Sequence, residues 1–414
     1  MTASPLDAGA AARLILEHVR LLAPVRVPLA QALGLVPAED VPAPLDVPPW
    51  DNSAMDGYAA RGADLRAGVV LRVIEEIPAG AVGSRRVGPG EAARIFTGAP
   101  LPAGADTVVR QEDTVPGPGT VRVTAAPEPG RNVRRRGEDL TRGAPVLQGR
   151  EPLTAAALGV LASVVHAEPL VHPRARVAFF ASGDELAAID RREEILSGSK
   201  IASSNSFTIA AAIRDAGAVP VDLGIVPDDR AALAARVPSA GTADLLVTTA
   251  GVSVGEHDLL RAAIADRGGT IHFSRVRIRP GGPLTFGVVQ GIPWLGLPGN
   301  PVSALVTFEL FVRPAIRKLQ GNARPFRRAI PVVTAEPLSL GPPLSHFLRV
   351  TLTAAGGGLP AARLTGSQSS GVLSSMARAD ALLIVPEDRP AVPAGERLTA
   401  IVLDDPEHVA EPPF

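Results

Sequence analysis

Cysteine is absent from this sequence of 414 residues. Its absence excludes disulfide bonds, thiolate metal sites and cysteine nucleophiles. Aromatic residues are scarce, at 3%, while 46% of the residues are hydrophobic, so we expect a core built from aliphatic side chains. Glycine and proline, with 41 residues each, predict many turns and short strands.

An excess of charge of either sign is also absent, because 41 Lys and Arg residues face 42 Asp and Glu residues. The sequence therefore creates no long-range field that favours nucleic acid or an anionic membrane, and any bound anion must be held locally. No apolar run reaches the length of a membrane span, and the first residues lack a signal-peptide pattern. We therefore expect a cytoplasmic protein.

The length of the chain predicts two to four domains rather than one core. Residues 1–26 are expected to form an N-terminal helix, with Ser4 as its cap and Pro5 in its first turn. Residues 27–172 carry short apolar runs broken by glycine and proline, which predicts linker and β-rich domains, with a β-rich insert at about 50–140. Similar runs in residues 323–414 predict a small C-terminal β domain.

Residues 173–322 have a different rhythm, in which short buried strands alternate with helices. Alternation of this kind predicts a central α/β domain with a doubly wound, mainly parallel sheet that helices cover on both faces. Strands are expected at 176–181, 219–223, 244–248, 271–278 and 292–297. Helices are expected at 205–216, 229–237 and 258–266, and from Pro301 onward with Asn300 as the cap.

Three polar, glycine-containing loops follow predicted strands, at residues 182–185, 250–258 and 298–301. Because ligands bind beyond the carboxyl ends of the strands in open α/β sheets, we expect these loops to converge on one edge. Glycines let an anion approach the backbone, and amides at a helix N-terminus favour phosphate. Any one of these loops alone is more simply a tight turn, but three at one edge favour a site for a phosphorylated ligand.

The same edge is rich in carboxylates, and no pair of histidines has the spacing of metal ligands. Oxygen ligands of this kind suit Mg²⁺ bound together with substrate phosphates. An alternative for Asp228 and Asp229 is that they begin a helix, where acidic side chains complement the helix dipole. His257 is more simply a hydrogen-bonding residue than a metal ligand. The carboxylates are Asp184, Glu185, Asp228, Asp229, Glu256 and Asp258.

Several longer motifs occur in a fixed order along the chain. Residues 51–59 read DNSAMDGYA, residues 94–100 read RIFTGAP and residues 134–139 read RRRGED. Further motifs lie at 182–185, 251–258, 279–281 and 296–304. With these motifs the sequence resembles the molybdopterin molybdenumtransferase family, which includes the E domain of gephyrin. The resemblance is strong from Pro44 to about Leu319 and weak in the C-terminal domain.

The resemblance implies an elongated subunit of four parts that forms a homodimer. Its pterin site would lie between the α/β domain of one subunit and the segment with Asp56 and Thr97 of the other. Family members take adenylated molybdopterin and molybdate, use Mg²⁺ and release AMP. A molybdopterin adenylyltransferase is therefore the expected donor, and neither nucleic acid nor a membrane is an expected partner.

The resemblance also implies roles for individual residues. Asp56 and Thr97 would act where molybdenum is transferred, with Asp139 and Arg136 contributing from the β-rich domain. Without it, Asp56 would be a turn residue before Gly57, and residues 134–136 a solvated or interfacial run of charge. The expected catalytic residues are Asp56, Thr97, Asp139, Glu185 and Asp258, and the expected Mg²⁺ ligands are Glu185, Asp228 and Asp258. The residues expected to bind the pterin, nucleotide and molybdate groups are Ser182, Gly183, Asp228, Gly251, Ser253, Arg279, Pro298, Gly299, Asn300 and Pro301.

One position departs from the family pattern. Many members read Lys-Pro-Gly-Lys-Pro where this chain reads RPGGP at residues 279–283. Arg279 can bind an oxyanion more rigidly than a lysine, but Gly282 lacks a charge that would help to hold molybdate or phosphate. The sequence does not distinguish molybdate from tungstate.

Two alternative functions remain open. The segment from about Pro173 to Gln320 alone resembles molybdopterin adenylyltransferase, although that enzyme does not need the motifs of Asp56 and Thr97. A non-catalytic scaffold similar to gephyrin is favoured only if the catalytic carboxylates are lost, and here they are present.

Overall fold

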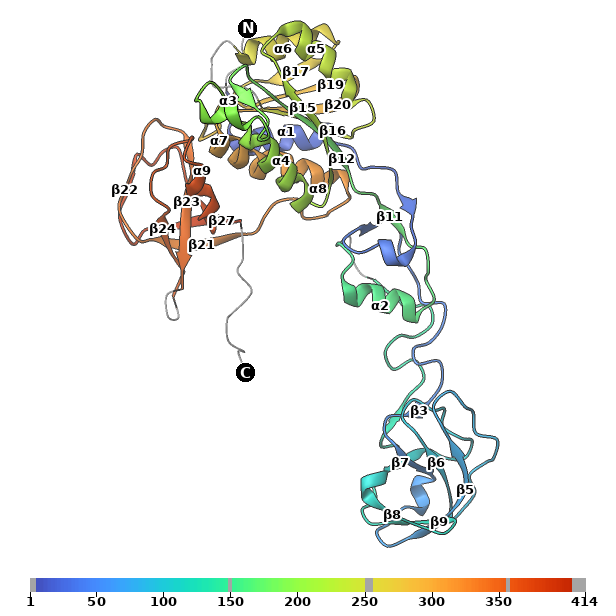
Figure 1. Cartoon of the computed structure of the whole chain (residues 1–414). Coiled ribbons are helices and arrows are strands. Elements are labelled where there is room, and N and C mark those ends of the chain that lie inside the picture. The colour runs from blue at the N-terminus through green and yellow to red at the C-terminus, as the bar shows by residue number, and fades with distance from the viewer. Residues whose placement is uncertain (1–4, 148–150, 250–255, 355–357, 404–414) are drawn as a thin grey trace.

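The computed structural model describes residues 5–147, 151–249, 256–354 and 358–403, and the side chains of residues 256–258 lie outside this description. The chain forms an elongated molecule, with an α/β domain and a C-terminal β domain at one end and a β-rich domain at the other (Figure 1). A small linker domain lies between them. In the described part, none of the helices has both the length and the apolar character that a bilayer crossing requires.

A six-stranded sheet in the order β15-β12-β16-β20-β19-β17 forms the centre of the α/β domain. The first four strands in that order pair in parallel, and only β19 runs in the opposite direction, between β20 and β17, so the mainly parallel sheet predicted from the sequence is confirmed. The strands are β12 (Arg176–Ser182), β15 (Val219–Val226), β16 (Leu245–Thr249), β17 (Thr270–Phe273), β19 (Thr285–Val289) and β20 (Ile292–Leu297).

The single strand expected at 271–278 is wrong. Strand β17 ends at Phe273, and β18 (Ile278–Arg279) pairs instead with a strand of the C-terminal domain. Between them the Val276 amide bonds back to the Gly282 carbonyl, so the chain leaves the central sheet before Ile278. Two short apolar runs on different sheets have the same local pattern as one long strand.

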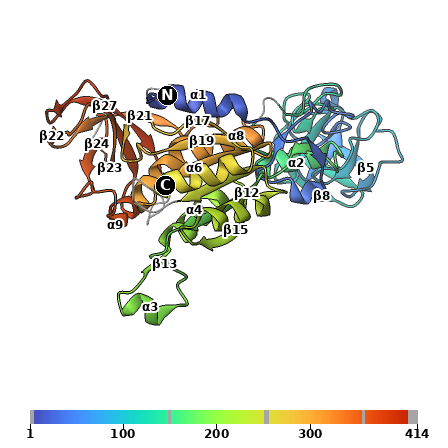
Figure 2. The same ribbon diagram turned by 90° about the horizontal axis from the view of Figure 1, so that it is seen from above.

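Helices cover both faces of the sheet, as the alternating rhythm predicted (Figures 1 and 2). Because successive side chains of a strand point to opposite faces, Val177 and Phe179 of β12 join one core and Ala178 and Phe180 the other. The first core includes α4 (Ser204–Asp215), α7 (Pro301–Thr307) and α8 (Arg313–Leu319), with a π-helical segment (Phe308–Val312) between the last two. The second includes α5 (Arg230–Arg236) and α6 (Glu256–Asp266).

The N-terminal helix α1 (Ala8–His18) packs on the first of these cores through Ala11, Ile15 and Val19. Its cap is Asp7, whose Oδ1 accepts a hydrogen bond of 2.8 Å from the Ala10 amide. The capping role expected for Ser4 is therefore wrong, because the helix begins one turn later, and Ser4 itself lies outside the described residues.

The linker domain joins two segments that are far apart in the sequence. Strands β1 (Val25–Arg26), β11 (Leu170–His172) and β2 (Val36–Pro37) form its sheet, which packs with the short 3-10 helix Leu29–Gln31 and with α2 (Ala155–Ser163). From here the chain runs out and back as a stalk, residues 42–53 and 133–145, which includes β3 (Asn52–Ser53) and β10 (Val133–Arg134). The two passes are antiparallel, with Pro42 opposite Pro145 and Val47 opposite Leu140.

The stalk carries the β-rich domain, a six-stranded sheet in the order β7-β4-β6-β5-β9-β8. Two apolar clusters, around Leu71 and around Ile95, form its core. The short helical turns beside the sheet are Gly62–Asp64 and Gln111–Asp113. Its strands are β4 (Gly57–Ala60), β5 (Val70–Ile77), β6 (Glu91–Ile95), β7 (Thr107–Arg110), β8 (Thr114–Gly117) and β9 (Thr120–Val123).

The C-terminal domain is a closed barrel, because β23, β24, β21, β27 and β25 pair in a ring that returns to β23. Strand β18 of the α/β domain adds to β23, so the two domains share backbone pairing. The barrel strands are β21 (Ala329–Thr334), β23 (Ser345–Thr353), β24 (Ala361–Leu364), β25 (Ala381–Val385) and β27 (Arg397–Val402). A two-stranded pair, β22 (Leu338–Ser339) and β26 (Ala391–Val392), and helix α9 (Leu373–Ala377) complete the domain.

An excursion that the sequence pattern did not predict leaves the α/β domain directly after β12. It consists of β13 (Leu186–Ala187), α3 (Arg192–Leu196) and β14 (Ile201–Ala202), and it projects from the body of the domain (Figure 2). One side of its base lies next to the carboxyl end of β12, where the candidate site begins.

Candidate functional site

A hollow of about 250 Å³, here called the edge pocket, lies at the carboxyl ends of β12, β16 and β20. The loops at 182–185 and 298–301 both line it, as expected for loops that follow neighbouring parallel strands. The third loop of the prediction, with Gly251 and Ser253, lies outside the described residues. The residues around the edge pocket are Ser182, Glu185, Leu186, Ile201, Ala202, Ser203, Ser204, Asn205, Thr249, Gly299, Asn300, Pro301 and Gly371.

Asn205, in the first turn of α4, was not among the predicted site residues. Its Nδ2 donates a hydrogen bond of 2.7 Å to the Gly299 carbonyl and so fixes the loop between β20 and α7. Its Oδ1 is buried and has no hydrogen-bond partner among the described residues. Since a buried acceptor without a donor is costly, this oxygen is suited to an N–H or O–H group of a ligand in the edge pocket.

The C-terminal barrel also reaches the edge pocket, through residues 367–371. Asn300 directly precedes α7, but its side chain does not cap the helix and instead donates a hydrogen bond of 3.0 Å to Ser370 Oγ. The Val302 amide donates to the Ser370 carbonyl at 3.1 Å. Gly371 then lines the pocket. The barrel therefore helps to set the position of the loop at 298–301.

Arg349, in β23, holds this barrel loop from behind. It is fully buried, and it donates from Nε to Ser375 Oγ and from Nη2 to the carbonyls of Ser367 and Ser369. Its Nη1 has no hydrogen-bond partner among the described residues, and none of their carboxylates pairs with it. Burial lowers the pKa of Arg349 to about 10, so the group stays charged at neutral pH. No local pattern in the sequence indicates this buried cation.

Gly183 and Glu185 are packed closely together at the end of β12. Gly183 has a φ of +154°, and a β-carbon there would lie 2.7 Å from both oxygens of the Glu185 carboxylate. Glycine therefore lets this carboxylate lie against the backbone beside the edge pocket. The described residues donate no hydrogen bond to the Glu185 side chain, which leaves its oxygens available to a cation.

Asp228 and Asp229 have different partners. Asp228 Oδ2 accepts from the Asp184 amide at 3.3 Å, and the Asp228 amide donates to Asp184 Oδ1 at 3.2 Å, so the two loops hold each other. Asp229 Oδ1 accepts a bond of 2.8 Å from the Ala232 amide and caps α5. The helix-capping alternative is therefore confirmed for Asp229, while Asp228 is placed beside the predicted site.

The expected Mg²⁺ ligand set combines Glu185, Asp228 and Asp258. Asp258 lies in α6, and its side chain is outside the description. Among the residues that are described, no group of three carboxylate or histidine side chains is arranged to hold a metal ion. The exposed Glu185 carboxylate and the half-buried Asp228 offer the oxygen atoms that Mg²⁺ prefers, so the donor chemistry fits this ion.

Arg279 and Gly282 lie where β18 joins the barrel. Arg279 is exposed, makes no ion pair with another described residue, and lies against Gly341, where a β-carbon would be 2.6 Å from its Nη1. A β-carbon at Gly282 would lie 3.3 Å from the Ile278 carbonyl oxygen and 3.4 Å from that of Val276. The position that is lysine in many family members is therefore tightly enclosed by backbone in this chain.

Asp56 and Thr97 form one hydrogen-bonded unit in the β-rich domain. Asp56 Oδ1 accepts from the Thr97 amide and from the Thr97 hydroxyl, both at 2.8 Å. These bonds, with a smaller contribution from the charge of Arg94, lower the pKa of Asp56. The carboxylate is therefore ionised over a wide pH range, and Asp56 is more than the turn residue that its local sequence suggested.

The other residues expected from the β-rich domain lie along the stalk. Asp139 is exposed, and its amide donates to the Val47 carbonyl at 3.0 Å. Arg136 pairs with Asp46 at 2.5 Å, and its amide donates to Asp51 at 2.8 Å. In this arrangement Arg136 joins the two passes of the stalk.

The edge pocket and the Asp56–Thr97 unit lie at opposite ends of the single chain (Figure 1). One chain therefore does not bring the two predicted halves of the site together. The stalk between them is a defined, hydrogen-bonded structure, so a large bend within one chain would have to break it.

Comparison with known proteins adds to this geometry. Models of the MoeA N-terminal region (domain I and II), of a probable molybdopterin binding domain and of the MoeA C-terminal region (domain IV) match residues 6–165, 178–318 and 331–403. The molybdopterin molybdenumtransferase 2 of Mycobacterium tuberculosis (strain ATCC 25618 / H37Rv) is 40% identical over 397 residues, which cover 93% of this chain and 96% of the relative. The molybdopterin molybdenumtransferase of a Nostoc species is 37% identical over 387 residues, 91% of this chain and 88% of the relative.

Solved structures agree with these matches. A molybdopterin biosynthesis MoeA protein from Pyrococcus horikoshii OT3 has 27% sequence identity and a TM-score of 0.79, over 96% of this chain and 100% of that one. The agreement therefore includes the β-rich domain, the α/β domain and the barrel. On these grounds the chain belongs to the molybdopterin molybdenumtransferase family.

Proposed function

We propose that this protein inserts molybdate into adenylated molybdopterin, with Mg²⁺ present and AMP released, at a site shared by two subunits of a homodimer. The observation that carries the proposal is the edge pocket, to which the loops at 182–185 and 298–301 and the barrel residue Gly371 contribute. Relatives that match nearly the whole chain are named molybdopterin molybdenumtransferase. This name favours the transferase over the adenylyltransferase and scaffold alternatives.

The edge pocket is suited to a ligand that has both donors and anionic groups. The Oδ1 of Asn205, which has no hydrogen-bond partner among the described residues, can accept a hydrogen bond from an N–H group of the pterin. The charge of Arg349 behind the barrel loop, which pairs with no described carboxylate, favours an anion. Gly251 and Ser253, whose structure is not described, remain expected contributors to this cradle.

Glu185 and Asp228, with Asp258 as a third expected ligand, would hold Mg²⁺ beside the phosphates. The ion would supply positive charge that neutralises the phosphoanhydride oxygens of the adenylate. Glu185 has the carboxylate that is free to do so, while Asp228 also ties its loop to Asp184. The residues of the chain then act mainly by orientation, because they fix the two ends of the substrate before the phosphoanhydride bond is cleaved.

Asp56 and Thr97 would act at the dithiolene end of the substrate, where molybdate enters. Thr97 holds the Asp56 carboxylate in its ionised form, and an ionised carboxylate can accept the proton of a dithiolene thiol as its Mo–S bond forms and pass it to the molybdate oxygen, which leaves as water after it has received two such protons. Because this unit is far from the edge pocket in one chain, we assign it to the site of the partner subunit. An adenylyltransferase would supply the substrate, and the cytoplasmic location stays a prediction.

The function is tested by AMP release from adenylated molybdopterin, with and without molybdate. Molybdate-dependent release together with formation of active cofactor is the expected result. Formation of the adenylated pterin from ATP and molybdopterin would instead support the adenylyltransferase. AMP release at the same rate with and without molybdate would contradict the proposed insertion.

The shared site is tested with two tagged, co-expressed heterodimers. One pairs Asp56→Asn with Glu185→Gln, and the other pairs the double variant with the parent chain. If each site uses two subunits, the first heterodimer keeps one intact site and about half of the parent activity, and the second has none. If each site lies within one subunit, the first heterodimer has no activity and the second keeps about half, and this result would refute the shared site.

A further inference from the structure

A second polar centre lies at the other end of the helical segment that begins at the edge pocket. Helices α7 and α8 and the π-helical segment between them run from Pro301 to Leu319. At 1.5 Å per residue, Arg317 lies roughly 24 Å along this axis from Pro301. The centre is therefore separate from the edge pocket, and no step of the proposed reaction uses it.

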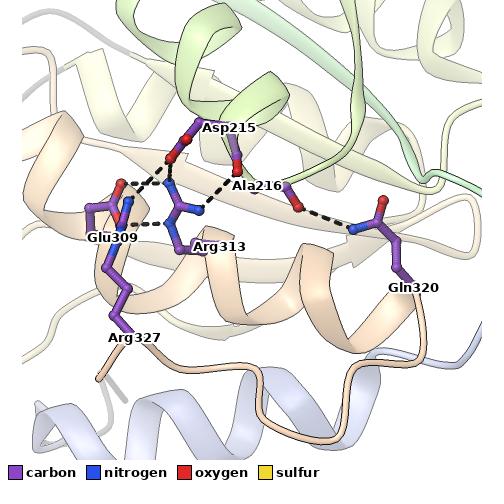
Figure 3. A network of polar contacts seen from close by, with 6 residues as sticks. All are labelled: Asp215, Ala216, Glu309, Arg313, Gln320 and Arg327. Atoms are coloured by element: carbon purple, nitrogen blue, oxygen red, sulfur yellow. Dashed lines mark hydrogen bonds and ion pairs between the residues drawn. The ribbon is translucent and has the colours of Figure 1, made fainter. Parts of the chain in front are cut away.

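Buried charges hold this region together (Figure 3). Arg313, whose side chain is only 5% exposed, pairs with Glu309 at 2.6 Å and with Asp215 of α4. Arg327, from the connection to the barrel, pairs with the same Glu309 at 2.6 Å and with the same Asp215 at 3.2 Å. Two arginines thus share two carboxylates, and together these four groups carry no net charge.

Arg317 lies next to this network and is not neutralised by it. Its side chain makes no ion pair with a described residue, and among these residues it donates a hydrogen bond only from Nε to the Arg324 carbonyl, at 3.4 Å. Burial, followed by repulsion from Arg313, lowers the pKa of Arg317 against an attraction from Glu151, although a guanidinium stays protonated at neutral pH. Because Arg317 is half-buried and forms no ion pair with a described residue, an anion would stabilise it.

Arg317 faces a hollow of about 290 Å³, here called the arginine pocket. The described polar residues that line it are Arg313, Arg317, Arg327 and Arg328, with no carboxylate among them. The remaining walls are apolar, with the half-exposed Phe326 and the end of β27. A hollow of this size is at the lower end of small-molecule sites. It accepts a compact anion rather than a large ligand.

We propose that the arginine pocket is a binding site for a phosphate group, either inorganic phosphate or the phosphate of a monoester. Guanidinium groups bind phosphate through two parallel N–H···O bonds, and several arginines can share the oxygens of one tetrahedral ion. A phosphate would accept bonds from Arg317 while Arg313 and Arg327 keep their carboxylate partners. The site joins α8 to the first residues of the barrel, so binding would fasten the two domains together.

The test is a titration of the ¹⁵N-labelled full chain with inorganic phosphate at constant ionic strength, followed through the arginine Nε–Hε resonances. The resonance that is missing in Arg317→Gln identifies Arg317, which separates this site from any phosphate bound at the edge pocket. A saturable shift of that resonance is the expected result. Absence of a saturable shift, or equal binding of acetate, would overturn the proposal.

Matched variants distinguish a built site from a charged surface. Calorimetry with inorganic phosphate should show binding to Arg317→Gln that is at least about tenfold weaker, because a charge-assisted hydrogen bond is lost. The control Arg324→Gln removes an arginine that is 79% exposed, pairs with Glu151 and does not line the pocket. Its affinity should stay within about twofold of the parent. Equal losses in both variants would contradict a specific site.

Another variant and another ligand test the same pocket. If Arg317→Gln does not fold, Arg317→Lys keeps the charge and should bind phosphate more weakly than the parent through loss of the guanidinium fork. The affinities of AMP and of inorganic phosphate are compared, and the ligand that binds more tightly identifies the source of the phosphate group.

A chain that ends at Leu403 lacks Asp404, Asp405, Glu407 and Glu411, which follow the pocket in the sequence. Phosphate binding to that shortened chain alone would overturn the proposal for the full chain.

Discussion

The polar residues of the α/β domain and those of the β-rich domain are held in different ways. In the α/β domain, Glu309 and Arg313 are nearly buried and are bonded to several partners at once. In the β-rich domain, Asp56 is partly exposed, and Thr97 is the one described residue that donates hydrogen bonds to its carboxylate. Substitutions in the first region should therefore change folding, whereas those in the second should change chemistry and leave folding intact.

The sharpest way to break this contrast is Glu309→Gln. Loss of the carboxylate leaves Arg313 with one partner instead of two, and removal of one member of a buried ion pair costs about 3–5 kcal/mol. We expect the free energy of unfolding in denaturant to fall by roughly 3 kcal/mol. The control Glu387→Gln breaks a pair with Arg277 that is about 40% exposed on both sides and should cost at most about 1 kcal/mol. Equal effects of the two variants would remove the contrast.

Asp56→Asn should give the opposite result. Loss of the ionised carboxylate should reduce the rate of cofactor formation by roughly 10²–10³. The free energy of unfolding should change by at most about 0.5 kcal/mol, because the group is near the surface. The control is Asp113→Asn, which removes another partly exposed carboxylate of the same domain, one that pairs with Arg110. A parent-like rate for Asp56→Asn would refute its assigned role.

Thr97→Val keeps the Asp56 carboxyl group but removes part of what holds it in its ionised form. The Thr97 bonds lower the pKa of Asp56, so activity that needs the carboxylate is complete above its ordinary pKa and is lost as the pH falls through the lowered value. The variant keeps the backbone bond and loses the hydroxyl bond, so the pKa should rise part of the way. A ¹³C NMR titration of the Asp56 carboxyl group measures this shift, and an unchanged titration would contradict it.

Ser370→Ala tests the smallest effect, on the contact between barrel and edge pocket. The Asn300 amide would lose its bond to the hydroxyl, which should cost about 1 kcal/mol of stability and raise KM more than it lowers kcat. The control Ser163→Ala removes an exposed local bond at the end of α2 and should cost less than about 0.5 kcal/mol. An unchanged KM would mean that the barrel loop does not help to shape the pocket.

The sequence predicted those parts of the fold that depend on local patterns. Buried apolar runs placed β12 and β20 within one or two residues, and Asp229 was recognised as a possible helix cap because the dipole argument needs only neighbouring residues. The first and third glycine loops were expected on one edge because the rule for parallel strands is general.

Contacts between distant segments could not be predicted in this way. Ser370 meets Asn300 from 70 residues away, and Arg349 is buried by a loop whose sequence resembles any polar turn. The excursion with α3 contains too few apolar residues to produce a periodic signal. The same limit explains why 271–278 was read as one strand, since the choice of sheet depends on β23, far along the chain.

The antiparallel stalk has a consequence for handling this protein. Both passes leave and enter the linker domain side by side, with Pro42 opposite Pro145, and they are tied by the ion pair of Arg136 and Asp46. The β-rich domain is thus an insertion with neighbouring ends, so a genetic deletion that joins the two passes near Ala43 and Ala144 needs only a tight turn. A single proteolytic nick in either pass should leave the two fragments associated until a denaturant is added.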